Sequence, residues 1–359
     1  MIKYLSSNHW IFNAVKPLDS AAAEQAQSYQ NTLTKPPGSL GFLETLAIKF
    51  AACQGQKKPL LNEICVRVFA ADHGVCDKGV SAFDQAVTAA MIANFASGGA
   101  AISVLSRIIE ADFAVVNLGT VSAVELPSAP THSKPQATII DAYIADKTQD
   151  FSEYPAMTNE QLTLALAAGK REIDNRQMDL FIGGEMGIGN TTCASALYGA
   201  LLGLDASKTV GPGTGVDQAG VEHKQNVVRQ ALHLHANILD DPIAVLACLG
   251  GFEIAALCGA YMACAQRGVP VVVDGFISTA AALVAAKINP RIVDWFIFSH
   301  CSAEPAHRLA LDFFQAEPLI DFSMRLGEGS AAALVVPLIQ SALKLHNEMA
   351  SFSEAGIIS

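Results

Sequence analysis

Six short apolar runs, rich in β-branched residues, recur along the chain at 65–71, 112–119, 137–142, 178–184, 269–275 and 295–300. Their apolar positions are continuous rather than alternating, which is typical of strands that are buried on both faces. Ala-rich segments with a helical pattern separate most of these runs, at 85–107, 159–174, 191–203, 243–266 and 277–287. This alternation predicts a three-layer α/β fold, in which helices flank a mostly parallel, six-stranded, Rossmann-like sheet.

The two ends of the chain have a different pattern. Residues 19–33 and 334–350 are helical in pattern and have no neighbouring strand, so we expect them to pack together as a small helical subdomain. The predicted organisation is one globular unit, 1–359, with an α/β core domain at 35–333 and a small helical subdomain made of 1–34 plus 334–359. The proline-rich segment 126–136 predicts a loop.

Polar residues follow four of the predicted strands closely. "DHGV" follows the first strand, "GGEMGIGNTT" the fourth, "DGF" the fifth and "SHCSAE" the sixth. Ligands of such sheets bind at the carboxyl ends of the strands, so these segments predict one site. Ordinary turns would explain the glycines, but not the acidic and histidine side chains that gather there: Asp72, His73, Glu185, Asp274 and His300.

Composition narrows the class of ligand. The net charge is −11, from 23 basic and 34 acidic residues, which argues against a nucleic-acid partner. A small phosphorylated ligand stays compatible with this charge, because backbone amides can bind phosphate. The eight cysteines form no C-x-x-C pair and the nine histidines form no zinc motif, so we expect reduced thiols in a cytoplasmic protein and no metal site.

Membrane insertion is not expected. The N-terminus has no long apolar block and no small-residue cleavage site of the kind that signal peptides carry. Two stretches, 85–106 and 186–204, lack charge over about the length of a membrane span. Both contain Gly, Asn, Ser and Thr, a composition that favours buried helices over lipid-exposed ones.

The stretch "GGEMGIGNTT", residues 183–192, is typical of a phosphate site. Gly184 and Gly189 have the spacing of a phosphate-binding P-loop, but Asn190 stands where the loop carries its lysine. Glycines let the backbone approach an anion, and the helix that begins near Thr191 would point its free amides at that anion. A single phosphate therefore fits better than a nucleoside triphosphate with magnesium. The structural alternative is a glycine turn with a threonine helix cap.

Two further segments leave alternatives open. "VVVDGFIST", 271–279, lacks the second acidic residue and the Thr-Gly-x-Thr of the usual phosphoribosyltransferase loop. "GPGTGVD", 211–217, is a glycine-rich turn, and Lys224 follows Asp217 by seven residues. Lys224 could meet a phosphate as a point charge, or it could be an ordinary solvated helix residue.

Seven segments occur in the order typical of one enzyme family: "TKPPGSLGFLE", "FAADHGV", "GGEMGIGNTT", "GGFEIAAL", "VVVDGFIS", "SHCSAE" and "RLGEGSAAAL". In these segments, which span about Thr34 to Val336, the chain resembles the nicotinate-nucleotide–dimethylbenzimidazole phosphoribosyltransferases. The resemblance implies a pentosyltransferase that moves phosphoribose from nicotinate mononucleotide to dimethylbenzimidazole. The products would be nicotinate and α-ribazole phosphate, for the nucleotide loop of cobalamin.

The chemistry that the resemblance implies needs few groups. The outgoing nicotinate ring is already a cationic pyridinium, so its departure requires neither a general acid, nor a metal, nor a cofactor. The incoming benzimidazole must lose its N–H proton, which requires one base. The resemblance places that role on Glu328, between two glycines in "LGEGS". The alternative for Glu328 is a first-turn or helix-cap residue. Glu185 would hold the ribose hydroxyls or assist the base.

The resemblance also assigns the rest of the site. Seven residues would bind the phosphate and nucleotide: Gly187, Gly189, Asn190, Thr191, Lys224, Gly251 and Ser302. The acceptor base would contact Phe83, Met91 and Leu326. Family members often carry Ser and Gln where Phe83 and Met91 stand, so another benzimidazole, a purine or a phenol is an alternative acceptor.

Two other functions and one assembly state complete the expectations. The family is homodimeric, so a homodimer is implied here. A Rossmann-type oxidoreductase would need G-x-G-x-x-G after the first strand, where the chain instead reads "ADHGVCDKG". A non-catalytic nucleotide sensor would keep the pocket without the chemistry, but the Glu328 carboxylate favours an enzyme.

Overall fold

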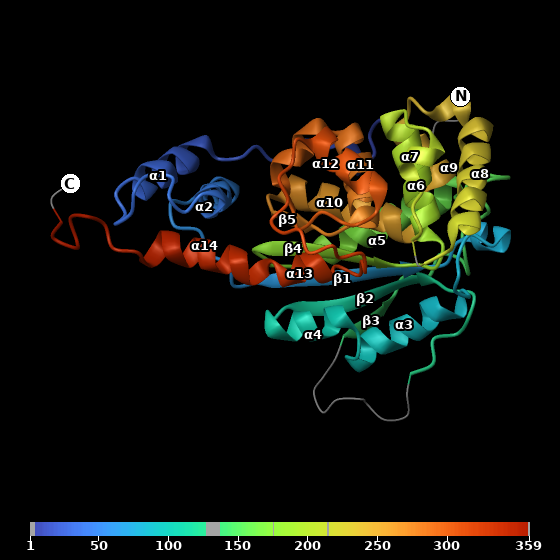
Figure 1. Ribbon diagram of the computed structural model, residues 1–359, viewed down its shortest axis with the longest axis horizontal. Coiled ribbons are helices and arrows are strands. Elements are labelled where there is room, and N and C mark those ends of the chain that lie inside the picture. The colour runs from blue at the N-terminus through green and yellow to red at the C-terminus, as the bar shows by residue number, and fades with distance from the viewer. Residues whose placement is uncertain (1–3, 127–136, 175, 214, 358–359) are drawn as a thin grey trace.

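The computed structural model describes residues 4–357 except 127–136, 175 and 214. Its sheet is parallel throughout and has the strand order β3-β2-β1-β4-β5-β6. The strands are β1 (Ile64–Ala71), β2 (Asp112–Gly119), β3 (Thr138–Asp141), β4 (Leu180–Met186), β5 (Val271–Val273) and β6 (Phe296–Phe298). Helices cover both faces, so the predicted three-layer α/β fold is confirmed (Figure 1). Most of the predicted proline-rich loop lies outside the described residues.

The helices have the following bounds. They are α1 (Ser20–Gln30), α2 (Phe42–Gln54), α3 (Ala86–Ser97), α4 (Ala101–Ile108), α5 (Asn159–Ile173), α6 (Asn190–Leu202), α7 (Ala206–Thr209), α8 (Gln218–Leu234), α9 (Pro242–Leu249), α10 (Phe252–Arg267), α11 (Phe276–Ile288), α12 (Pro305–Phe314), α13 (Ser330–Leu334) and α14 (Val336–Glu348). Short 3₁₀ helices lie at Trp10–Phe12, Gly74–Lys78, Ala236–Ile238 and Pro290–Trp295.

Each strand contributes side chains to two cores, one on either face of the sheet. In β5, Val271 and Val273 join the core under α5, α10 and α11, whereas Val272 joins the core under α3, α4 and α13. Successive side chains of a strand point to opposite faces, so a strand buried on both faces must be apolar at every position. This explains why the runs seen in the sequence are continuous.

Two predicted helices are each divided by a pair of glycines. The segment 85–107 forms α3 and α4, because Gly98 adopts φ +80° and ends α3. The segment 243–266 forms α9 and α10, which are separated at 250–251. The stretch Ala86–Ile108 is apolar and long enough to cross a membrane, but it is interrupted here, and 56% of its most apolar window is buried. That environment is typical of core helices.

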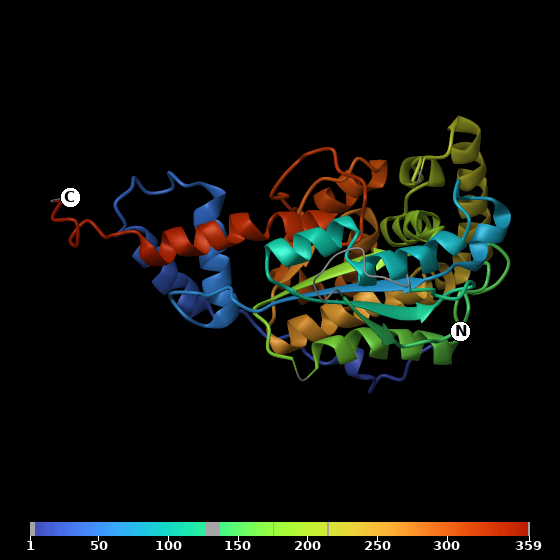
Figure 2. The same ribbon diagram turned by 90° about the horizontal axis from the view of Figure 1, so that it is seen from below.

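The two ends of the chain meet beside the core. Helices α1 and α14 both pack against α2, and Leu33 pairs with Ser351 in an antiparallel bridge. Figures 1 and 2 show this group at one end of the molecule, where α14 extends beyond the sheet. Helix α2 belongs to this group, although its residues fall inside the predicted core domain. The division of the chain at residues 34 and 334 stays a prediction.

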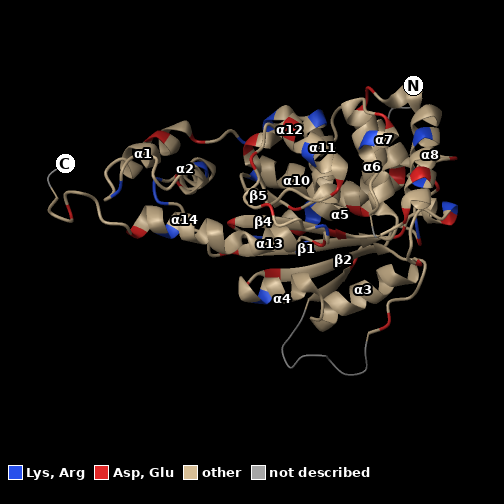
Figure 3. Cartoon of the chain, viewed as in Figure 1, with Lys and Arg blue, Asp and Glu red and all other residues tan. Residues whose placement is uncertain are grey.

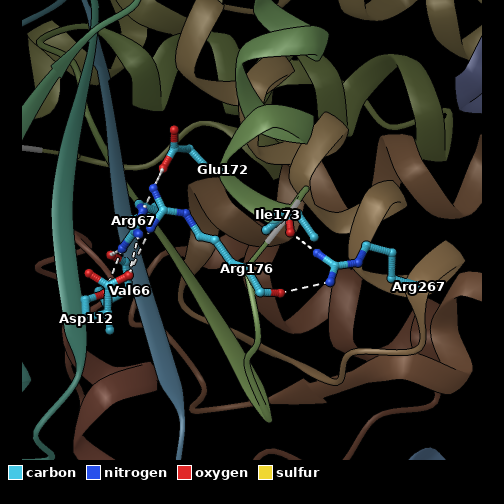
Figure 4. A network of polar contacts seen from close by, with 7 residues as sticks. All are labelled: Val66, Arg67, Asp112, Glu172, Ile173, Arg176 and Arg267. Carbon is cyan, nitrogen blue, oxygen red and sulfur yellow. Dashed lines mark hydrogen bonds and ion pairs between the residues drawn. The ribbon is translucent and has the colours of Figure 1, made fainter.

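A buried arginine links the strands at the end of the sheet opposite to their carboxyl ends. Arg67 of β1 donates to Glu172 of α5 at 2.8 Å and to Asp112 of β2 at 2.6 Å (Figure 4). Arg176 donates to the same two carboxylates. Elsewhere the lysines and arginines are scattered over many elements (Figure 3). The Arg67 network therefore fixes β1, β2 and α5 together.

Candidate active site

A cavity of about 450 Å³ lies at the carboxyl ends of β4, β5 and β6. Its walls come from the end of β4, the start of α6, the start of α11, the segment after β6 and the turn at 325–328. The lining residues are Phe83, Glu185, Met186, Gly187, Ile188, Asn190, Thr191, Gly213, Gly275, Phe276, Ile277, His300, Ser302, Glu304, Arg325, Leu326, Gly327 and Glu328. Three of the four polar segments predicted to converge therefore line one cavity. The fourth, which contains Asp72 and His73, is fully buried and does not line it.

The turn that carries Glu328 is made of three consecutive left-handed residues. Gly327, Glu328 and Gly329 adopt φ values of +84°, +64° and +82°. A non-glycine residue pays a steric cost for this conformation, and such residues concentrate at functional sites. A side chain at Gly327 would also overlap the carboxylate of Glu185. The two glycines therefore allow the turn to lie against β4 and to bring Glu328 to the cavity.

Asp274 holds this turn in place. Asp274 follows β5, is buried, and accepts hydrogen bonds from the backbone amides of Gly329 at 3.2 Å and Ala332 at 2.9 Å. These amides belong to the N-terminus of α13, which is capped by Asp274 and not by Glu328. The interpretation of Glu328 as a helix cap is therefore wrong, and its side chain stays available to the cavity.

The surroundings of Glu328 favour a base that works near neutral pH. Its side chain lines the cavity, yet the residue is only 7% exposed. Burial and, second, the nearby charge of Asp274 raise the pKa of the Glu328 carboxyl to about 7. A general base is most effective when its pKa is close to the working pH.

Glu185 lies beside Glu328 on the floor of the cavity. One carboxylate oxygen accepts a hydrogen bond from the Glu328 amide at 3.4 Å, and the other accepts from the side-chain amide of Asn190. Burial raises the pKa of Glu185 well above its usual value, and the charges of Glu253 and Asp274 raise it further. Glu185 therefore links the turn that carries Glu328 to the start of α6.

The first turn of α6 lies against the cavity. The helix begins at Asn190, and its cap, Gly189, adopts φ +95°. Gly187, Asn190 and Thr191 line the cavity, whereas Gly189 lies behind them against Cys76. The Asn190 and Thr192 amides donate to the carbonyls of Gly187 and Gly189. The Thr191 amide and the dipole of this 13-residue helix therefore favour an anion at this point.

Lys224 supports Thr191 from behind. It is 1% exposed, does not line the cavity, and donates to the Thr191 hydroxyl oxygen at 2.9 Å. Burial lowers the pKa of Lys224 to about 8. The interpretation of Lys224 as a solvated helix residue is therefore wrong. Because the Thr191 oxygen accepts from Lys224, the hydrogen of the Thr191 hydroxyl remains free to be donated into the cavity.

The other predicted site residues divide between the cavity and the layer behind it. Ser302 lines the cavity, and Phe83 and Leu326 form its rim, with exposures of 53% and 56%. Met91 is half-buried on α3 and does not reach the cavity. Gly251 lies behind the cavity, against the buried pair of His73 and Glu253, whose side chains form a hydrogen bond at 2.9 Å.

Several lining residues lie within sequence motifs, although the sequence alone indicates no role for them. Glu304 ends "SHCSAE", Gly213 lies inside "GPGTGVD", and Arg325 begins "RLGEGS". Their position within a motif was the only sequence feature that could have identified them as site residues, because their contacts join segments far apart in the chain. Within the described ranges, no group of three or more His, Cys, Asp or Glu side chains could hold a metal ion.

Comparisons with known proteins agree on one family. A family model described as "Phosphoribosyltransferase" matches residues 15–357. Nicotinate-nucleotide–dimethylbenzimidazole phosphoribosyltransferases of Pseudomonas putida and Azotobacter vinelandii are 51% and 50% identical, over 97% of this chain and 97% of theirs. The crystal structure of the Thermus thermophilus enzyme of that name superimposes with a TM-score of 0.86, at 39% identity, over 95% of this chain and 100% of that one. The chain therefore belongs to the family of nicotinate-nucleotide–dimethylbenzimidazole phosphoribosyltransferases.

Proposed function

We propose that this protein transfers phosphoribose from nicotinate mononucleotide to dimethylbenzimidazole, forming α-ribazole phosphate and nicotinate for the nucleotide loop of cobalamin. The observation that carries the proposal is the position of Glu328. A buried carboxylate with a pKa of about 7 lines the same cavity as the first turn of α6, whose helix dipole favours an anion. A base and a phosphate subsite in one cavity are the two features that this transfer needs.

The bond changes balance without a metal or an acid. The free ring nitrogen of the benzimidazole attacks the anomeric carbon of the ribose. The bond from that carbon to the nicotinate ring breaks, and its electron pair returns to the pyridine nitrogen. Glu328 takes the N–H proton of the incoming ring, so the product ring is neutral. Glu185, beside Glu328, accepts hydrogen bonds from the ribose hydroxyls.

The phosphate is bound by the amides of Gly187 and Thr191 and by the Thr191 hydroxyl. Lys224 contributes its charge and orients that hydroxyl at 2.9 Å. Ser302 also lines the cavity and supplies a further hydroxyl donor. Gly189 and Gly251 contribute by close packing behind this subsite, against Cys76 and the His73–Glu253 pair.

The direct test incubates the pure protein with nicotinate mononucleotide and dimethylbenzimidazole. Mass spectrometry should detect α-ribazole phosphate, with one nicotinate released for each molecule formed. Binding of nicotinate mononucleotide without release of nicotinate would instead indicate a nucleotide sensor.

The acceptor side of the cavity is formed by Phe83 and Leu326, whose exposed apolar side chains suit a flat aromatic ring. A competition among dimethylbenzimidazole, adenine and phenol tests this assignment. Dimethylbenzimidazole should be used first. A preference for adenine or phenol would leave nicotinate mononucleotide as the proposed donor but would assign a different acceptor. Phe83→Ser should alter the ranking, and Met91→Gln, outside the cavity, serves as the matched control.

Three further properties belong to the same proposal: the enzyme needs no metal, acts as a homodimer and works in the cytoplasm. Support for metal independence is that the pyridinium leaves unaided, so turnover should survive EDTA. Exposed apolar side chains, such as Phe322 and, on α14, Leu338, support self-association, which light scattering would test. All eight cysteines are free, as in cytoplasmic proteins, and fractionation of cells would test the location.

A further inference from the structure

His307 is a fully buried histidine behind the cavity that the proposed reaction does not use. It lies in the first turn of α12 and is 0% exposed. Its Nδ1 atom lies 2.7 Å from the backbone nitrogen of Ser302, and its Nε2 atom lies 3.0 Å from the hydroxyl oxygen of Thr279 on α11. The ring therefore joins the segment that follows β6 to α11, whose first residues line the cavity.

The contact with Ser302 fixes the position of the proton on the ring. A backbone amide can only donate, so the Nδ1 atom of His307 must accept and carries no hydrogen. Burial and, second, the neighbouring His300 lower the pKa of His307 to about 3, so the ring is neutral near neutral pH. A neutral imidazole has one N–H, which therefore lies on Nε2 and donates to Thr279. Both nitrogen atoms of the ring are thus committed to specific partners.

Ser302 is held in its segment by a side chain, whereas its neighbours are held by the backbone. The amides of Cys301 and Ala303 each donate to a backbone carbonyl at 3.2 Å, but the Ser302 amide between them donates to His307. The Ser302 hydroxyl oxygen accepts from the Glu304 amide at 3.4 Å. The hydrogen of that hydroxyl is therefore free to be donated into the cavity, which Ser302 lines.

We propose that His307 is a positioning residue for substrate binding, which fixes the Ser302 amide so that the Ser302 hydroxyl donates to the bound nucleotide. This inference rests on the role of Ser302 in the proposed function. His307 itself does not line the cavity. Without an acceptor at position 307, the buried Ser302 amide would lose its partner, and the segment would have to shift to satisfy it. The affinity for nicotinate mononucleotide should then fall, while the chemistry at Glu328 stays unchanged.

Two substitutions separate the two contacts of the ring. His307→Asn places an amide oxygen near the position of Nδ1 and keeps an acceptor for Ser302. His307→Gln places its amide nitrogen near the position of Nε2, so it keeps the donor for Thr279 and loses the acceptor for Ser302. Titration calorimetry with nicotinate mononucleotide alone should give a Kd about tenfold above wild type for His307→Gln, and within about threefold of wild type for His307→Asn. At saturating substrate, kcat of His307→Gln should stay within about threefold of wild type.

A matched control is available at His346 on α14, at the end of the chain that packs beside the core. His346 is also fully buried, and its Nδ1 and Nε2 atoms pair with the Gln30 side-chain amide and the Lys57 carbonyl, both at 2.8 Å. His346→Gln therefore removes the same kind of acceptor away from the cavity. It should lower the melting temperature, as His307→Gln does, but leave the Kd for nicotinate mononucleotide unchanged.

A double variant tests whether His307 acts through Ser302. Ser302→Ala should raise the Kd about tenfold, and adding His307→Gln should raise it no further. Effects that multiply in the double variant would overturn the proposal, and so would a Kd for His307→Gln equal to that of wild type or of His307→Asn.

A spectroscopic measurement on wild type applies even if the variants fold poorly. Nitrogen NMR shifts of the histidine rings should show His307 as the Nε2–H form from about pH 5 to about pH 8. An Nδ1–H form, or titration of His307 in this range, would exclude the contact with Ser302 and overturn the proposal. Binding needs no turnover, so the expected Kd values in a protein that forms no α-ribazole phosphate would refute the proposed function alone.

Discussion

Asp274 accepts a hydrogen bond from the backbone amide of Ala332 at 2.9 Å, and this contact joins the end of β5 to the helix that follows the turn at Glu328. The same carboxylate also accepts from Gly329, directly after Glu328. One buried residue thus fixes the left-handed turn and places a second negative charge near Glu328. Geometry and electrostatics of the proposed base therefore depend on Asp274.

Replacing Asp274 by Asn should change the pH dependence of the reaction. The charge of Asp274 raises the pKa of Glu328, second only to burial, so its removal should lower that pKa. The acid limb of the kcat/KM profile should then shift to lower pH than in wild type. The Asn side chain can accept from only one of the two backbone amides that Asp274 binds, so circular dichroism must first show that the variant is folded. An acid limb that stays in place or moves upward would contradict this electrostatic coupling.

Replacing Glu328 by Gln removes the base and keeps the shape of the side chain. We expect kcat to fall about 10²-fold or more, the usual contribution of a general base, while the KM for nicotinate mononucleotide changes little. In wild type, kcat/KM should rise through about pH 7, where Glu328 loses its proton. The residual activity of Glu328→Gln should lack this rise. Normal turnover in the variant would show that Glu328 is not the general base.

The same substitution should stabilise the folded protein at alkaline pH. The Glu328 carboxyl has a usual pKa of 4.5, and in the folded chain burial raises the pKa to about 7. A raised pKa favours folding below about pH 4.5, and that contribution is lost as the pH rises through about 7. The Glu328→Gln variant has no titratable group at this position, so its stability does not fall in this way as the pH rises. Its melting temperature should therefore exceed that of wild type by more at pH 8 than at pH 5, and an equal difference at both would exclude the linkage.

These residues also show what the sequence could predict. The strands were predicted because each run had to be apolar on both faces, and the cavity was predicted because parallel strands end at one edge. The glycine pairs at 98–99 and 250–251 were visible, but their effect depends on φ values that only the packed structure fixes. The roles of Asp274 and Lys224 depend on hydrogen bonds to residues 55 and 33 positions away, which no local pattern encodes.

Lys224 and Thr191 should act as one unit in substrate binding. Lys224 is buried behind Thr191, so we propose that it acts largely by orienting the hydroxyl. Lys224→Met and Thr191→Val should each raise the KM for nicotinate mononucleotide by about tenfold, the value of one hydrogen bond to a charged group. Thr191→Ser keeps the hydroxyl and should restore most of the loss.

The double variant distinguishes an indirect role of Lys224 from direct contact with phosphate. If Lys224 acts through Thr191, the Lys224→Met/Thr191→Val protein should have a KM close to that of either single variant. Two independent contacts would instead multiply their effects. Steady-state kinetics of the four proteins at pH 7, where Lys224 is still protonated, measures this coupling.

The Arg67 network should govern stability without affecting catalysis, because it lies at the opposite end of the sheet from the cavity. The Arg67 side chain is 1% exposed and pairs with Glu172, whose side chain is 8% exposed. Arg67→Met leaves the Glu172 carboxylate buried with only Arg176 as an ion-pair partner. This change should lower the free energy of unfolding by about 3 kcal/mol. Arg176→Met is the matched control. Its side chain is 37% exposed and its loss should cost less than about 1 kcal/mol.

Urea titrations of the three proteins measure these free energies, and kcat of the folded fraction should be unchanged in both variants. An Arg67→Met/Glu172→Met protein removes both buried charges at once. It should recover much of the stability that Arg67→Met loses, because the cost arises from an unpaired buried carboxylate rather than from a missing attraction. If the double variant is as unstable as Arg67→Met, packing around Arg67, and not its charge, holds β1 against α5.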